Sequence, residues 1–172
     1  MEFTEILNPK TIVTHLKADN KAEALEALAD LFVRTGTVKD KETYLKDVYV
    51  RERIGETGIG NHIAIPHGRS ESVVRPGAAI AVLDHEIEWE SLDDTGAKVV
   101  ILFAVGTDNA AAEDHLRLLA MFSKRLGNDA VVSKLMDADA VEDVMHILTE
   151  ESGEEETETN EEELDPDEIL IL

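Results

Sequence analysis

Hydrophobic and polar residues recur along the first 150 positions with two different periods, which separate helical from extended segments. Leu25, Leu28 and Phe32 have the spacing of one buried helix face, and Gly36 follows them as a stop signal. Tyr44 and Val48 continue the same kind of apolar row in the next segment. By this reasoning, the pattern predicts helices over residues 19–36, 39–55, 108–127, 129–136 and 139–149.

Continuous apolar runs predict the strands. Residues 77–84 and 98–106 are apolar almost throughout, as is typical of strands buried on both faces. Residues 85–90 alternate polar and apolar positions and predict a half-exposed strand, while 63–65 predict a short one. Helices that interleave with strands indicate an α/β or α+β domain, with helices on both faces of the sheet.

The charge of the chain is unevenly distributed. Its 172 residues carry a formal net charge of -22, which disfavours nucleic acid and anionic membrane surfaces as partners. Residues 51–75 differ, because they hold four arginines against three glutamates. A locally basic segment in such an acidic chain indicates an anion site.

Other bulk features limit the possible classes. The chain has no cysteine, so it has no disulfide and no thiolate metal site. It shows neither a signal peptide nor a long apolar span, so we expect a cytoplasmic domain without direct membrane insertion. Residues 1–150 are predicted to form this domain, and the acidic segment 151–172 is predicted to be a disordered tail or, less simply, a docking element.

The basic segment contains the stretch TGIGNHIAIPHGR, in which Pro66 immediately precedes His67. Proline restricts both its own φ and the residue before it, so we expect a rigid corner that presents an exposed imidazole. A neutral imidazole is a good nucleophile near pH 7. If the tripeptide PHG at residues 66–68 is taken alone, the simpler interpretation is a loop histidine without a role.

Three neighbouring features favour phosphate chemistry. Arg51 ends a predicted helix before the glycine-rich loop, and its planar guanidinium suits phosphate, although the dipole of the helix C-terminus also favours an arginine there. The glycines of the loop and Gly68 can bring backbone N–H groups close to an anion. His115 belongs to the apolar row of the long helix and faces inward, as many structural histidines do.

The histidines and carboxylates of the chain also allow other interpretations. A zinc site built from His62, His67 and His115 lacks a recognised ligand spacing, so we expect no metal and no cofactor. Four carboxylates at positions 84, 86, 88 and 90 are interpreted as a solvated strand face. The absence of a G-x-x-x-x-G-K-[ST] loop argues against ATP as the phosphoryl donor.

The stretch TGIGNHIAIPHGR, together with EDHLRLLAMFSKRL, resembles the enzyme IIA domain of the fructose–mannitol class of the bacterial phosphoenolpyruvate:sugar phosphotransferase system. The resemblance covers about residues 3–150, and the segment after His115 is more similar to fructose-type members and nitrogen-regulatory relatives than to mannitol-type ones. It implies a mixed β-sheet flanked by α-helices on both faces, a three-layer α/β/α domain. It also implies either a sugar phosphocarrier or a nitrogen-type regulatory protein whose phosphorylation state controls partner binding.

In the sugar phosphocarrier, the resemblance implies that His67 accepts a phosphoryl group from phospho-HPr and passes it to a cysteine of a IIB partner, which serves a membrane IIC permease. Arg51 then matches the arginine that steadies the phosphoryl group, and His115 matches the second histidine of the active site. The chain departs from the family pattern at His62, where a small or polar residue is usual, and in its acidic tail.

Overall fold

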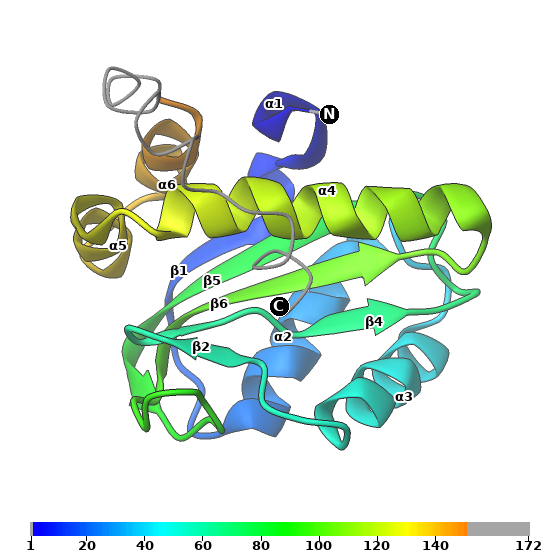
Figure 1. The fold of residues 1–172 in the computed structure, drawn as a ribbon, viewed down its shortest axis with the longest axis horizontal. Coiled ribbons are helices and arrows are strands. Elements are labelled where there is room, and N and C mark those ends of the chain that lie inside the picture. Colours follow the sequence, from blue (N-terminus) through cyan, green and yellow to red (C-terminus); the bar gives the residue numbers. More distant parts are fainter. Residues whose placement is uncertain (1, 151–172) are drawn as a thin grey trace.

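The computed structural model describes residues 2–150 (Figure 1), so the predicted acidic tail lies outside the described residues. The helices are α1 (Phe3–Ile6), η1 (Pro9–Thr11, a 3₁₀ turn), α2 (Lys21–Arg34), α3 (Lys41–Glu52), α4 (Asn109–Leu126), α5 (Asp129–Met136) and α6 (Val141–Thr149). The strands are β1 (Ile12–Leu16), β2 (Gly58–Gly60), β3 (Ile63–Ala64), β4 (His67–Arg69), β5 (Gly77–Ile87) and β6 (Ala97–Val105).

The six strands form one mixed sheet. Its order is β1-β5-β6-β3-β2, and β4 also pairs with β6. The contacts of β1 with β5 and of β6 with both β3 and β4 are parallel, whereas β5–β6 and β2–β3 are antiparallel. The predicted mixed sheet with flanking helices is confirmed.

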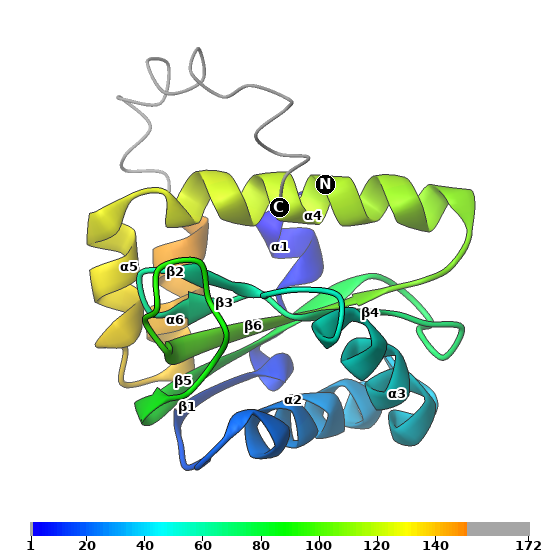
Figure 2. The ribbon, with the colours of Figure 1, turned by 60° about the horizontal axis from the view of Figure 1, so that its bottom comes forward.

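Two hydrophobic clusters fill the spaces above and below the sheet. Along β6, Ile101 and Phe103 belong to the cluster under α4, α5 and α6, while Val100 and Leu102 face α2 and α3. This alternation is the period of two that a strand imposes on its side chains. Figure 2 shows the sheet between α4 on one side and α2 with α3 on the other. Because helices cover both faces of the sheet, the sequences of its central strands are continuous apolar runs.

Most predicted helices begin and end within a few residues of the observed ones, but several strands differ. The predicted strand 85–90 is wrong as a separate element, because β5 continues through to Ile87. Strand β1 was not predicted. It has only five residues, and its pairing is irregular between Val13 and Leu16, where His15 has a positive φ of 56°. Within residues 2–150, no helix is both long and apolar enough to cross a membrane.

Helix α3 is fixed to the sheet beside β4. The buried hydroxyl of Tyr44 donates a hydrogen bond of 2.7 Å to the carbonyl of Phe103 on β6. Gly68 of β4 faces Tyr44 and Val48, and a Cβ at this position would lie 2.6 Å from the Val48 Cγ2 atom and 2.7 Å from the Tyr44 Cε1 atom. The close approach of β4 to α3 therefore depends on the absence of a Cβ atom at Gly68.

We expect a Gly68→Ala substitution to lower the free energy of unfolding by about 1–3 kcal/mol, because the added methyl group overpacks this contact. Gly55→Ala is the matched control, since a Cβ there meets no atom within 4 Å. Urea unfolding of both variants measures the difference. Equal stabilities for the two variants would contradict the packing role of Gly68.

Candidate functional site

The strand β4 brings His67 to the sheet. Strands β3 and β4 pair with β6 in one continuous register, with His67 opposite Phe103. Pro66 interrupts the ladder because it has no N–H to donate, yet its carbonyl accepts a hydrogen bond of 3.0 Å from the Phe103 N–H. The prediction of a corner at Pro66 is wrong, since the chain continues in the same direction along β6.

The ring of His67 is buried rather than exposed, in contrast to the prediction. Only 8% of the residue is accessible, because His115 on α4 lies against it. The two ring centroids are 4.6 Å apart and the ring planes are inclined by 52°. The predicted inward orientation of His115 is observed, as the same helix face continues into buried Leu118 and Leu119.

Both histidines keep a buried polar atom without a hydrogen bond. Among the described residues, neither Nδ1 of His67 nor Nε2 of His115 has a partner. Buried polar side-chain atoms in folded proteins are usually paired, and the exceptions often have a functional role. Two such atoms on adjacent rings indicate a place where a further group binds.

Arg51 and Arg69 supply positive charge from two different elements. Arg51 lies in the last turn of α3, where its Nη1 donates a hydrogen bond of 3.1 Å to the carbonyl of Gly55. Arg69 is the last residue of β4, two positions after His67, and its Nη2 lies 3.4 Å from the carbonyl of Thr107. The sequence predicted a role for Arg51 but not for Arg69. Recognition of residues 67–69 as a strand would have placed Arg69 on the face of His67.

Burial and nearby positive charge favour the neutral form of both rings. Burial, followed by the charges of His115 and Arg51, lowers the pKa of His67 from 6.5 to about 3, with the backbone of Ile65 opposing this shift. Burial, Arg69 and Arg51 also lower the pKa of His115. A neutral imidazole retains a lone pair, so His67 is in the nucleophilic form at pH 7.

We predicted that the glycines of the loop bring backbone N–H groups close to an anion, but at least two of them have another role. The N–H of Gly58 donates to the carbonyl of Glu90 at 2.9 Å, so it is not available to a ligand. A Cβ at Gly58 would collide with Ser91, and Gly60 has a positive φ of 92°. These two glycines therefore satisfy backbone packing and conformation.

His62 lies away from the two site histidines, at the turn between β2 and β3. Its Nδ1 atom is 2.5 Å from a carboxylate oxygen of Glu86, and the backbone N–H of His62 donates a hydrogen bond to the hydroxyl of Thr95. The three histidines considered as zinc ligands therefore do not converge. Within residues 2–150, no group of three His, Asp or Glu side chains has the arrangement of a metal site.

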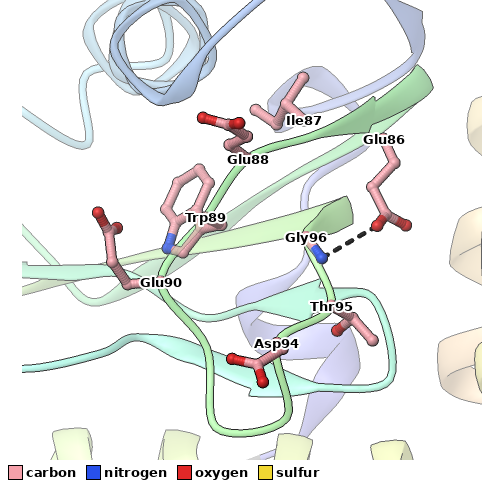
Figure 3. Close-up of a pocket in the computed structure, with 8 residues that line it drawn as sticks. All are labelled: Glu86, Ile87, Glu88, Trp89, Glu90, Asp94, Thr95 and Gly96. Carbon is pink, nitrogen blue, oxygen red and sulfur yellow. Dashed lines mark hydrogen bonds between the residues drawn. The ribbon is translucent and has the colours of Figure 1, made fainter.

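A hollow in the surface lies away from the two site histidines. It has a volume of about 530 Å³ and is lined by residues 86–90 and 94–96 (Figure 3). Figure 3 shows three glutamates and Asp94 around it, with Glu86 accepting a hydrogen bond from the Gly96 N–H. Three of the four carboxylates predicted to be solvated, Glu86, Glu88 and Glu90, line this hollow. Their negative charge makes the hollow unsuitable for phosphate.

The depressed pKa values predict a loss of stability in acid. Below pH 6.5 the unfolded histidine binds a proton that folded His67 does not bind until about pH 3, so protonation favours the unfolded state. We expect protonation of this histidine in the unfolded state to reduce the free energy of unfolding by at most about 1.4 kcal/mol per pH unit in that range. His67→Gln should therefore gain stability relative to the native chain between pH 6.5 and pH 5, as measured by urea unfolding.

His62→Gln is the control for this prediction, because His62 is partly exposed and faces Glu86. A constant stability difference between the native chain and His67→Gln at both pH values would show that His67 titrates normally.

Known proteins are similar to this chain in sequence and in fold. The chain is 33% identical over 150 residues to a nitrogen regulatory protein of Pseudomonas aeruginosa, covering 87% of this chain and 96% of that protein. It is 35% identical over 130 residues to the fructose-specific EIIA component of Haloferax volcanii, covering 76% and 83%. It is also 26% identical to the 2-O-alpha-mannosyl-D-glycerate-specific EIIABC component of Escherichia coli, covering 89% of this chain but only 23% of that longer protein.

Solved structures agree on the fold. The nitrogen regulatory protein IIA-Ntr from Neisseria meningitidis superposes with a TM-score of 0.77 at 24% identity, covering 84% of this chain and 97% of that one. The enzyme IIA of mannitol from Escherichia coli, in its complex with phosphorylated enzyme IIB, gives a TM-score of 0.71 at 23% identity, covering 83% and 96%.

The family model described as "Phosphoenolpyruvate-dependent sugar phosphotransferase system, EIIA 2" matches residues 5–151, nearly all of the described chain. The relatives include both sugar components and nitrogen regulatory proteins. The chain therefore belongs to the EIIA 2 family of the phosphoenolpyruvate-dependent sugar phosphotransferase system.

Proposed function

We propose that this chain is a cytoplasmic phosphocarrier in sugar uptake. His67 accepts a phosphoryl group from phospho-HPr and passes it to the cysteine of a IIB protein or domain, which in turn serves a membrane IIC permease. Arg51 steadies the phosphoryl group, and His115 donates a hydrogen bond to it. Fructose is the first sugar to test, because the Haloferax volcanii relative is named for it.

The observation that carries this proposal is the neutral ring of His67 against His115, with Arg51 close enough to lower the pKa of both rings. Phosphoryl transfer requires little covalent chemistry from the protein, so orientation and charge stabilisation dominate. A fixed neutral nucleophile beside a guanidinium provides both. A second ring with an unpaired buried nitrogen provides a donor that the bound group can use.

Uptake is a balanced exchange between two imidazoles. A ring nitrogen of His67 forms the new P–N bond with its lone pair while the P–N bond of the donor histidine breaks, and the bonding electrons return to the donor ring. One proton leaves the ring of His67 and one is taken up by the donor ring. The new phosphoryl charge favours a protonated His115, whose positive charge then stabilises it.

Reconstituted transfer tests the proposal. The full chain is incubated with phosphoenolpyruvate, enzyme I and HPr, and intact mass spectrometry follows the gain of one acid-labile phosphoryl group. Addition of the IIB protein of a fructose system should remove that group and place it on the IIB cysteine. Failure of the chain to take up the group would overturn the phosphocarrier assignment.

A regulatory function is the second candidate, favoured by the nitrogen regulatory relative that aligns over 96% of its own length. In that function, His67 is phosphorylated in the same way, but the output is a change in affinity for a regulator or channel. Retention of the phosphoryl group in the presence of IIB proteins, with altered binding of a partner, would support it. Rapid transfer to a IIB cysteine would exclude it as the main function.

A further inference from the structure

Arg69 shares the edge strand with His67 and projects on the same face. Residues two apart on a strand point the same way, and β4 pairs regularly with β6 from His67 to Arg69. Gly68 between them faces the opposite side, against Tyr44 and Val48 of α3. The packing that fixes Gly68 therefore also fixes the direction of Arg69 toward α4.

The guanidinium of Arg69 has no acidic partner among the residues that the structure describes. Its one hydrogen bond, from Nη2 to the carbonyl of Thr107, is long at 3.4 Å, and no carboxylate lies within 4.0 Å. Arg51 is in the same situation, since it donates to the carbonyl of Gly55. Two uncompensated guanidinium groups at one site are notable in a chain with 38 acidic residues.

The charge of Arg69 acts on the histidine pair. After burial, Arg69 is the largest influence that lowers the pKa of His115, ahead of Arg51. Because Arg51 also affects His67, the two arginines and the two rings belong to one electrostatic cluster. An anion placed there meets guanidinium groups from α3 and from β4, and both can bind phosphate oxygens in a planar, bidentate way.

We infer that Arg69 is a second phosphoryl-binding residue, which together with Arg51 holds the group carried by His67. This inference rests on the proposed function, because it needs a phosphoryl group on His67. Arg69 contacts the phosphoryl oxygens, speeds formation of the P–N bond and slows loss of the group to water. The weak bond to Thr107 is exchanged for the phosphoryl oxygens when the group arrives.

Phosphoramidate, a small phosphoryl donor, tests Arg69 without requiring a protein partner. A ring nitrogen of His67 attacks phosphorus while the P–N bond to ammonia breaks, and ammonia leaves with one proton. The variants are Arg69→Gln, Arg69→Lys and the control Arg75→Gln. Arg75 belongs to the same basic segment, and its donors reach the carbonyls of Thr35 and Gly36. The control therefore removes one positive charge away from the histidines.

We expect Arg69→Gln to slow labelling of His67 by about tenfold to a hundredfold. Loss of a single charge-stabilising donor from an active site costs about a hundredfold to a thousandfold, and Arg69 shares its role with Arg51. It should also shorten the lifetime of the phosphorylated chain and shift its ³¹P resonance. Arg69→Lys should recover part of the rate, because it keeps the charge but loses the planar fork. Arg75→Gln should behave as the native chain does.

The outcomes separate the two proposals. If the native chain is labelled on His67 but Arg69→Gln matches it in rate, lifetime and ³¹P shift, the inference on Arg69 is overturned and the phosphocarrier assignment stands. Equal losses in Arg69→Gln and Arg75→Gln would show a general effect of net charge, which also overturns it. A native chain that phosphoramidate and phospho-HPr both leave unlabelled would overturn the proposed function and the inference together.

Discussion

The His67→Gln variant is expected to take up no phosphoryl group from phospho-HPr. Glutamine approximates the size and polarity of the imidazole, but its amide nitrogen has no free lone pair for attack on phosphorus. The native chain should gain one acid-labile group under the same conditions. Intact mass spectrometry after incubation with phosphoenolpyruvate, enzyme I and HPr measures the difference.

His62→Gln is the control for this experiment, because it removes another histidine of the same motif. His62 contacts Glu86 rather than His115, so its replacement should leave uptake unchanged. Circular dichroism establishes that both variants fold. A folded His67→Gln chain that still carries one acid-labile phosphoryl group would place the acceptor on a different residue.

The core of the fold could be predicted from the sequence because both faces of the central strands are apolar. Residues 77–83 of β5 and nearly all of β6 are buried, and this uninterrupted burial is visible in the residue pattern. Strands β1 and β4 were missed for a different reason. Each has at most five residues, and in short edge segments the long-range pairing to β5 or β6 determines the structure.

The candidate site could be predicted only in part for the same reason. His67 and Arg51 stand out through their chemistry and their neighbours in the chain, and His115 through its place on a helix face. The burial of His67 depends on α4, which begins 42 residues later, so local sequence predicted an exposed ring. Arg69 was missed because its direction depends on the pairing of β4 with β6.

Arg51→Gln is expected to slow phosphoryl uptake by about a hundredfold, the lower end of the range seen when one charge-stabilising donor is removed from an active site. Its guanidinium is near enough to lower the pKa of both histidines, and its bonding to the Gly55 carbonyl leaves other N–H groups free for phosphate. The measurement is the initial rate of uptake from phospho-HPr, by rapid quench, at several donor concentrations.

Arg53→Gln is the matched control, since Arg53 is an exposed arginine two residues further along the same segment. Long-range attraction of a charged donor would be weakened about equally by either substitution and would diminish in salt. A direct contact with the phosphoryl group instead predicts a loss specific to Arg51, which persists at saturating donor and at high salt. Equal effects of the two variants would assign Arg51 to steering, and the stabilisation of the phosphoryl group would then have to come from His115 and Arg69.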